Sequence, residues 1–275
     1  MIQRKAKRTA RIGVFAVVHQ IYFEQFDGLQ ESLYGYHNDL IEMVKTNDVE
    51  VIDFGFVGNN SIAYEVAEEI KKQNIDLLMC NMITYATSSV FAPIIMGCDA
   101  PMILVALQPL SKLDYSKANT FMQLENDNIC SVPEFTGVAN RLGKKIYDVI
   151  IGTLYDDEAA KAELSKWCNI AMVLHGLKGA RMGLMGHTME AMYDMHADPT
   201  AISAAFNIHV PLLEIDDVVE VYNTITEDEI QAKIKVIDEE FDKPDPKSDP
   251  IPTKLTDADK RQAAKSAVAL DRLVE

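Results

Sequence analysis

Polar and aromatic side chains directly follow several apolar runs of this chain, and they are the residues best placed to do chemistry. In the stretch VVHQIYFEQF, residues 17–26, the apolar run stops at His19 and Gln20 and is followed by Tyr22. Neutral hydrogen-bonding groups and aromatic rings of this kind suit polyols and sugars better than phosphates. The sequence therefore predicts a binding site for a sugar-like small molecule, contacted by His19, Gln20, Tyr22, Tyr85, Gln108, His187 and Met189.

Motifs for other kinds of chemistry are missing from the sequence. The phosphate-binding pattern G-x-x-x-x-G-K-S/T does not occur, and GLMGH at residues 183–187 lacks the G-x-G-x-x-G spacing that lets backbone amides meet a pyrophosphate. The G-x-S-x-G turn that carries the nucleophilic serine of many hydrolases is also missing. The sequence thus predicts neither a nucleotide cofactor nor a nucleophilic serine.

A metal site in the stretch GHTMEAMYDMHAD is a weaker possibility. In a helix, the first three of its four ligand-type residues would share one face, but H-E-x-x-H and related ligand motifs do not match. We therefore favour local polar contacts and caps for these residues, which are His187, Glu190, Asp194 and His196. For His37, His175 and His209 we expect surface or packing roles.

The elements that would position the site alternate along the first half of the chain. Continuous apolar runs, typical of strands buried on both faces of a parallel sheet, are separated by segments with helical spacing of apolar residues. This alternation predicts βαβ units. In such sheets, ligands bind beyond the carboxyl ends of the strands, near the point where strand order reverses. The predicted strands are 12–18, 49–56, 75–82, 101–107 and 145–152, and the predicted helices are 23–45, 61–73, 88–97 and 134–142.

A second cycle follows a helix-like segment at residues 156–177. It has predicted strands at 182–185 and 208–215 and predicted helices at 199–206 and 217–223. Thr226 and Glu229 have the spacing of a capping box before a long helix. The proline-rich KPDPKSDPIP must be a loop, and a last helix begins at Thr256. We expect an α/β protein with two consecutive open, mostly parallel, doubly wound domains of Rossmann or flavodoxin-like type, covering residues 1–155 and 156–275.

Composition limits the partners. The 275 residues are 48% hydrophobic and 25% charged, with a net charge of -16, which argues against nucleic-acid or anionic-membrane binding. The four cysteines are scattered and form no C-x-x-C pair, as expected for reduced thiols in the cytoplasm. The basic start has no cleavage pattern of a signal peptide, and no apolar run reaches the roughly 20 residues of a membrane helix.

Several segments in collinear order resemble one enzyme family. The chain is similar to the L-arabinose isomerase and L-fucose isomerase-like sugar isomerases across nearly its whole length. The resemblance rests on RIGVFAVVHQIYFEQFDGLQESLYGYHNDLIEMV, VEVIDFGFV, IDLLMCNMITYATSSVFAPII, VALQPLSKLDY, CSVPEFTGVANRLG, RMGLMGHTMEAMYDMHADPT and AAKSAVALDRLVE.

The resemblance implies a role in aldose–ketose isomerisation. Members are homo-oligomers that use a divalent metal, usually Mn²⁺, bound by two glutamates and two histidines in the later part of the chain. On that comparison this chain ends before the first ligand glutamate, so we expect no metal to be bound and no catalytic residue to be present in it. Its N-terminal and central regions would instead contribute substrate contacts and assembly.

The resemblance also extends to individual positions. The family's Q-H-L-Y stretch, which reaches an active site completed by a neighbouring subunit, corresponds here to residues 19–22, with the order of the polar pair swapped and Tyr22 matching. Tyr85 matches an aromatic residue after the third strand. The family's Q-x-x-H becomes Asp127 and Cys130, which points to a divergent branch. Two alternatives stay open: a non-catalytic two-lobed sugar-binding or regulatory module, and a purely structural assembly domain.

Overall fold

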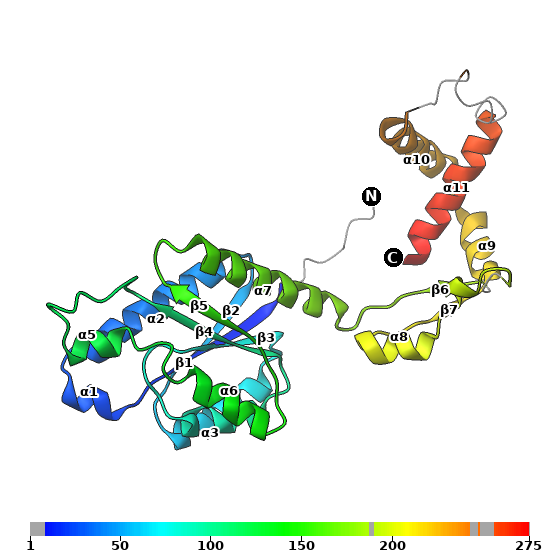
Figure 1. The fold of residues 1–275 in the computed structure, drawn as a ribbon. Helices are drawn as coiled ribbons and strands as arrows, with labels where there is room; N and C mark the ends of the chain where they lie inside the picture. Colours follow the sequence, from blue (N-terminus) through cyan, green and yellow to red (C-terminus); the bar gives the residue numbers. More distant parts are fainter. Residues whose placement is uncertain (1–8, 187–189, 243–246, 248–255, 275) are drawn as a thin grey trace. The chain divides into compact units, whose positions relative to one another are not determined.

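The structure is a computed structural model that describes residues 9–186, 190–242, 247 and 256–274. The chain divides into two compact units, of which the first ends at Gly176 and the second runs from Leu177 (Figure 1). No helix within these described residues is both long enough and apolar enough to span a membrane.

A parallel sheet forms the centre of the first unit. Its described strands are β1 (Arg11–Val17), β2 (Glu50–Val57), β3 (Leu77–Asn81), β4 (Met102–Gln108) and β5 (Ile146–Thr153), in the order β2-β1-β3-β4-β5. The three central strands are almost completely buried, whereas β2 and β5 lie at the edges and are partly exposed. Continuous apolar runs therefore mark strands covered on both faces, as predicted.

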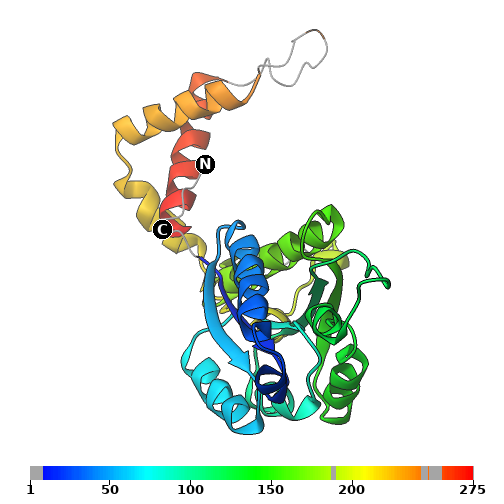
Figure 2. The same cartoon turned by 90° about the vertical axis from the view of Figure 1, so that its left-hand side faces the viewer.

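Helices cover both faces of this sheet (Figure 2). On one face, α2 (Leu29–Lys45) and α7 (Glu158–Leu177) share a core with the strands. On the other face lie α3 (Asn60–Lys72), α4 (Ala92–Gly97) and α6 (Val132–Arg141), packed around Phe91 and Phe135. The first unit is thus an α/β layer structure consistent with a Rossmann-like fold, and this part of the predicted fold class is confirmed.

Short helical segments lie in the connections. They are α1 (Ile21–Gln25), the 3-10 helix η1 (Ser88–Val90) and α5 (Thr120–Glu125). The single helix predicted for residues 23–45 is wrong, because α1 and α2 are separate. Gly28, at a φ of 85°, makes the left-handed turn between them, a conformation that residues with a Cβ rarely adopt.

The helix α7 belongs to the first unit, so the structure differs from the predicted boundary between residues 155 and 156. Leu164 and Ala171 are fully buried in the core on the α2 side of the sheet, together with Ile150. The indole Nε1 of Trp167 also donates to Oδ2 of Asp148 at 2.7 Å. The helix that follows the last strand covers that strand's own sheet, instead of opening a new domain.

The second unit is mainly helical where it is described. Strands β6 (Leu184–Met185) and β7 (Leu212–Leu213) pair in parallel, extended by a bridge between Arg181 and His209. The described part of this unit therefore forms a short two-stranded sheet, and a second doubly wound domain is not confirmed. Its helical elements are η2 (Tyr193–Met195), α8 (Pro199–Phe206), α9 (Ile215–Thr224), α10 (Glu227–Glu240) and α11 (Asp257–Val274).

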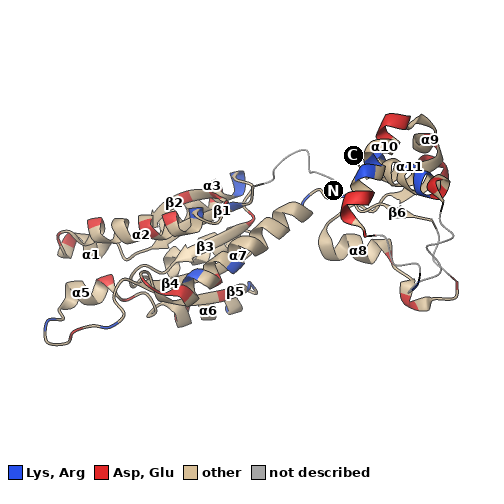
Figure 3. Cartoon of the chain, turned by 90° about the horizontal axis from the view of Figure 1, so that it is seen from above, with Lys and Arg blue, Asp and Glu red and all other residues tan. Residues whose placement is uncertain are grey.

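Helices α9, α10 and α11 pack around their own core, which includes Ile225, Ile230 and Val268. The predicted capping box is present, since the backbone N–H of Thr226 donates to Oε2 of Glu229 at 2.8 Å. Lysines, arginines and carboxylates occur on both α10 and α11 (Figure 3). Ion pairs across the two helices include Arg261–Glu227, Arg272–Glu229, Lys233–Asp271 and Lys260–Asp238.

Candidate functional site

The strand order reverses between β1 and β3. From β1 the chain passes outward to β2, and from β3 it passes to β4 and β5 on the other side. The connections after β1 and β3 therefore diverge, which leaves a crevice position beyond their carboxyl ends where ligands bind in sheets of this kind. His19 and Tyr22 follow β1, and Tyr85 follows β3, so the topology brings these three predicted residues to that position.

The three rings form an aromatic cluster, by which we mean His19, Tyr22 and Tyr85. The His19 and Tyr22 ring centroids are 5.0 Å apart with an interplanar angle of 89°. Tyr85 lies 6.2 Å from His19, at 88°, and 6.4 Å from Tyr22, at 48°. All three side chains are half-buried. The edge-to-face geometry fixes the rings against one another while leaving part of each accessible.

Local hydrogen bonds and packing set the position of Tyr22. The chain turns directly after β1, because the backbone N–H of Tyr22 donates to the carbonyl of His19 at 3.0 Å. The short helix α1 then places Tyr22, Phe23 and Phe26 against a small core that contains Val18 and Leu33. These three aromatic side chains hold the turn on the sheet and keep Tyr22 at the carboxyl end of β1.

An acidic pair, Asp127 and Cys130, lies beside the aromatic cluster. The Cys130 thiol donates a hydrogen bond to the Asp127 carboxylate. Burial raises the pKa of Asp127, and burial together with the charge of Asp127 raises the pKa of Cys130. The pKa of Tyr22 is raised by burial and by the proximity of Tyr85, Asp127 and Cys130. Asp127 and Cys130 therefore act electrostatically on Tyr22, as Tyr85 does.

The acidic pair was not among the predicted contact residues. The only sequence signal for it was the departure from the family's Q-x-x-H at residues 127 and 130. No apolar run ends at these positions, because they follow α5 rather than a strand. A rule that inspects only strand ends therefore misses them.

Buried hydroxyl and amide groups tie the loop that carries Tyr85 to the segment that carries the acidic pair. The Oγ1 of Thr84 donates to the carbonyl of Leu124 at 2.7 Å. The Oγ of Ser131 donates to the carbonyl of Ala86 at 2.6 Å and accepts from its N–H at 3.0 Å. Thr84 and Ser131 are each 1% exposed. The two segments are thus joined by buried hydrogen bonds on both sides of Tyr85.

His37 is fully buried beneath this edge of the sheet. Its Nε2 lies 3.0 Å from Oδ1 of Asp53, and its Nδ1 lies 3.1 Å from Nδ2 of Asn81, the last residue of β3. Because the Asn81 amide nitrogen donates to Nδ1, the other ring nitrogen, Nε2, is the donor to Asp53. We expected either a surface role or a packing role for His37, and the structure shows the packing role.

Two other predicted contact residues point into local interactions instead of the aromatic cluster. Oε1 of Gln20 accepts from Nδ2 of Asn59 at 2.9 Å, and Asn59 also caps α3 by accepting from the N–H of Ile62. Nε2 of Gln108 donates to the carbonyl of Leu110 at 2.6 Å, within its own turn. Gln20 therefore supports the start of α3, and Gln108 shapes the loop after β4.

The remaining predicted contacts, His187 and Met189, lie outside the described residues. Of the weaker metal candidates, His196 stacks on Tyr193 with ring centroids 5.1 Å apart. His175 has the structural role expected of it, since its Nδ1 lies 2.8 Å from the buried carboxylate of Asp76. In the part of the chain that the structure describes, no group of three or more His, Cys, Asp or Glu side chains could hold a metal ion.

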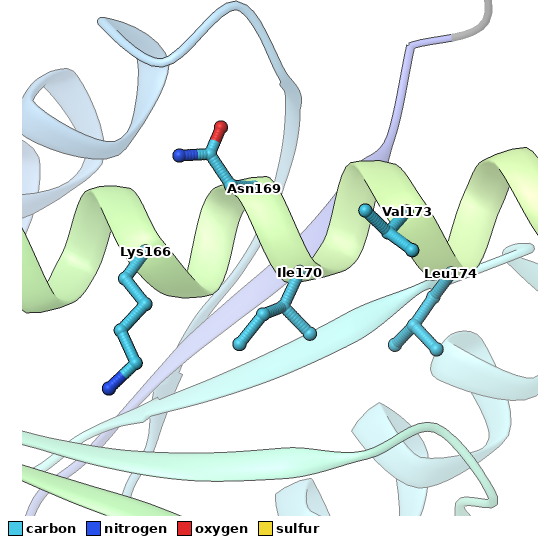
Figure 4. A pocket seen from close by; sticks show the side chains of 5 residues that line it. All are labelled: Lys166, Asn169, Ile170, Val173 and Leu174. Carbon is cyan, nitrogen blue, oxygen red and sulfur yellow. The ribbon is translucent and has the colours of Figure 1, made fainter.

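A shallow apolar hollow runs along the middle and end of α7 (Figure 4). It is lined by Lys166, Asn169, Ile170, Val173 and Leu174. Val173 is 62% exposed, and Lys166 is paired with Glu163. The hollow offers few groups that could orient a polar ligand, so the carboxyl ends of β1 and β3 remain the better candidate site.

Comparison of the chain with models of known protein families and with curated proteins gave no match. The chemistry of the site is therefore argued from its own groups. It combines aromatic ring faces, phenol and imidazole hydrogen-bonding groups, and one carboxylate held by a thiol. Such a set can bind and orient a small polar molecule.

Proposed function

We propose that this chain provides the sugar-binding surface of a metal-dependent aldose–ketose isomerase of the L-arabinose and L-fucose isomerase type. The observation that carries the proposal is the aromatic cluster at the point where strand order reverses. Tyr22 and Tyr85 are also two of the positions on which the resemblance to that family depends. The role is substrate contact, in a cytoplasmic homo-oligomer whose neighbouring subunit completes the active site.

The groups of the cluster suit the parts of a sugar. The ring faces can pack against its C–H surface, while the phenol oxygens and the imidazole nitrogens exchange hydrogen bonds with its hydroxyls. The carboxylate of Asp127 can accept a hydrogen bond from a further hydroxyl. These contacts bind and orient the substrate without themselves moving hydrogen between carbon atoms.

A divalent metal such as Mn²⁺ would polarise the carbonyl of the substrate in such an enzyme. The described residues of this chain do not fit a metal, because no three ligand-type side chains converge. The proposal therefore assigns the metal ligands to residues outside the described part of this chain. The second unit, with its parallel strands β6 and β7, would begin the second α/β lobe.

Binding of neutral sugars to the purified chain tests this proposal. Isothermal titration with a panel of aldoses, ketoses and alditols should give saturable binding, and Tyr22→Phe and Tyr85→Phe should each weaken it about 2- to 10-fold, the effect of one lost hydrogen bond. Tyr64→Phe is a matched control, since Tyr64 lies exposed on α3. No saturable binding of any sugar, or equal effects of all three variants, would contradict the proposal.

Activity measurements separate the proposed role from a complete enzyme. With Mn²⁺ and the same aldoses, the chain alone should show no turnover. Turnover by the purified chain would overturn the assignment of the chemistry to other residues. The second candidate, a non-catalytic sugar-binding module, is favoured by the fact that the aromatic cluster and the acidic pair come entirely from the first unit. Micromolar binding by the isolated chain would support it.

A further inference from the structure

Strand β5 is an edge strand that leaves apolar side chains open to water. Among the described strands it pairs with β4 alone. Tyr147 is 50% exposed and Ile151 is 55% exposed, whereas natural proteins commonly protect their sheet edges with charged side chains. An apolar edge of this kind is suited to contact with another protein surface.

Hollows lie on both sides of this strand. One of about 440 Å³ lies between β5 and the end of α6, and one of about 470 Å³ lies between β5 and the start of α7. Asp148 and Val149 line both of them, and the second shares Lys166 with the apolar hollow along α7. The three hollows therefore adjoin one another. We call the surface that they form, made of residues 144–158 and one stripe of α7, the edge surface.

The stripe of α7 repeats every three or four residues, so its members share one face of the helix. They are Ala159, Glu163, Lys166, Ile170 and Val173. Figure 4 shows the last three of these side chains along the helix. Glu163 and Lys166 form an ion pair at 2.9 Å in the middle of the stripe, and small or apolar residues lie towards both ends. Such an order fits a second copy of the same helix that runs in the opposite direction.

Charge changes sign along the edge surface. Basic residues come before β5, at positions 141, 144 and 145, and acidic residues follow it, at positions 156–158. A second copy that runs antiparallel brings the basic end of each β5 to the acidic end of the other, whereas a parallel copy would oppose like charges. With a two-fold axis between Ile150 and Ile151, Lys145 lies opposite Asp156 of the partner subunit. The edge surface is therefore complementary to itself, as a symmetric dimer requires.

The net charge of the chain opposes self-association, but it is not spread evenly. The whole sequence carries a charge of -16, so two copies repel each other at a distance. Residues 141–166, which include the end of α6, β5 and the first part of α7, contain five basic and five acidic residues. This part of the chain has no net charge, and repulsion between two copies is smallest where these residues meet.

We propose that the edge surface binds a second copy of this chain across a two-fold axis, with the two β5 strands antiparallel. Side chains make the contact instead of a backbone ladder, because the N–H groups of Val149 and Thr153 already donate to the carboxylates of Asp148 and Asp157, at 2.8 and 3.0 Å. The inference rests on the proposed function only in expecting a homo-oligomer. It adds the surface, and it does not depend on sugar binding.

Charge reversal in the full chain tests this arrangement. Sedimentation equilibrium over a range of protein concentrations should show a monomer–dimer equilibrium. Lys145→Glu and Asp156→Lys should each weaken the dimer roughly tenfold, because each symmetric dimer then contains two contacts between like charges. In a dimer of one Lys145→Glu subunit and one Asp156→Lys subunit, both contacts again join opposite charges. An equimolar mixture of the two variants should therefore recover the affinity of the parent chain.

Further variants separate this contact from general effects of charge and folding. Glu65→Lys and Lys72→Glu are the matched controls, since both residues are exposed on α3, which contacts β2 at the other edge of the sheet, and they should leave the dimer unchanged. Ile151→Thr keeps a β-branched side chain but removes apolar surface, and it should weaken the dimer a few-fold. Thermal unfolding establishes that each variant is folded before its affinity is interpreted.

The outcomes separate this inference from the proposed sugar binding. A chain that stays monomeric at every concentration overturns the edge surface as a contact and leaves the sugar titrations to be judged on their own. A dimer that neither charge reversal weakens, or that mixing the two variants does not restore, also overturns the proposal. A dimer that responds as expected but binds no sugar supports the edge surface and contradicts only the proposed function.

Discussion

The Nε2 of His37, a side chain with no exposed surface, lies 3.0 Å from Oδ1 of Asp53 on the neighbouring edge strand. The same carboxylate oxygen accepts from the N–H of Gly55 at 2.7 Å. Burial of Asp53 opposes its ionisation, but these hydrogen bonds outweigh burial and lower the pKa of Asp53. One acidic residue thus holds both a buried histidine of α2 and an irregular turn of β2.

This relationship predicts an acid-dependent loss of stability. The folded pKa of Asp53 is lowered, so its contribution is present above the unfolded value of about 3.9 and is lost as pH falls through the folded value. Between pH 7 and pH 3, the free energy of unfolding measured in urea should decrease less for Asp53→Asn than for the parent chain. Glu65→Gln, on the exposed side of α3, serves as the control. Identical pH profiles for all three proteins would refute this role.

Replacing His37 itself should cost more than replacing its partner. His37→Ala removes a fully buried ring and leaves the Asn81 amide without its acceptor, so we expect the free energy of unfolding to fall by about 2–4 kcal/mol. Chemical denaturation at neutral pH measures this. A change below about 0.5 kcal/mol, the usual size for a surface substitution, would show that the network contributes little.

The hydrogen bond between Tyr36 and Glu125 predicts a loss of stability at alkaline pH. Its hydroxyl donates to Oε1 of Glu125 at 3.1 Å, and burial followed by the charge of Glu125 raises its pKa to about 12. The contribution of this proton is complete below the unfolded value of about 10 and is lost as pH rises through about 12. The free energy of unfolding, measured by circular dichroism from pH 9 to pH 12, should fall less steeply with pH for Tyr36→Phe than for the parent chain. Tyr64→Phe should behave like the parent chain.

Gly152 tests the junction between β5 and α7. A Cβ there would collide with the carboxylate of Asp157, which caps α7 by accepting from the N–H of Ala160 at 3.0 Å. Gly152→Ala should therefore destabilise the chain by about 1–3 kcal/mol. Gly137→Ala is the matched control, since its Cβ meets nothing within 4 Å in α6 and alanine favours a helix. Equal melting temperatures for the two variants would contradict the predicted clash.

Ser131 tests the link between the two segments of the site. Ser131→Ala leaves the N–H and carbonyl of Ala86 without their partner in a buried place, at a cost of about 1–3 kcal/mol. Because Tyr85 and the acidic pair lie on the joined segments, the variant should also weaken ligand binding at temperatures where it remains folded. The exposed Ser61→Ala is the control. Unchanged affinity in a destabilised Ser131→Ala protein would limit this serine to a structural role.

Much of the first unit follows from the sequence because long apolar runs admit few alternatives to buried parallel strands. The C-terminal boundary of the first unit does not follow from the sequence. The spacing of apolar residues in α7 reveals a buried face, but it does not reveal which sheet covers that face. His37 illustrates a missed signal: it shares a helical spacing with Leu33, Leu40 and Val44, all buried, and this pattern predicts burial.

The site is predictable only in part, because the sequence pattern places strand ends but not the partners of individual side chains. The aromatic cluster follows from strand ends, because parallel strands deliver their carboxyl ends to one edge. Gln20 and Gln108 occupy equivalent positions, yet their amides are used within the protein, and spacing alone does not reveal such pairings. The acidic pair depends on how the segment after α5 folds back, which no local pattern encodes.

The position of α7 also decides where this polypeptide can be divided. A fragment that stops at residue 155 would leave Ile103, Ile150 and Leu107 open to water on one face of the sheet, and we expect it to aggregate or to be degraded during expression. A fragment that continues to Gly176 retains the helix over these side chains. Limited proteolysis should accordingly spare the stretch from β5 to the end of α7 and release a stable piece that still carries the aromatic cluster.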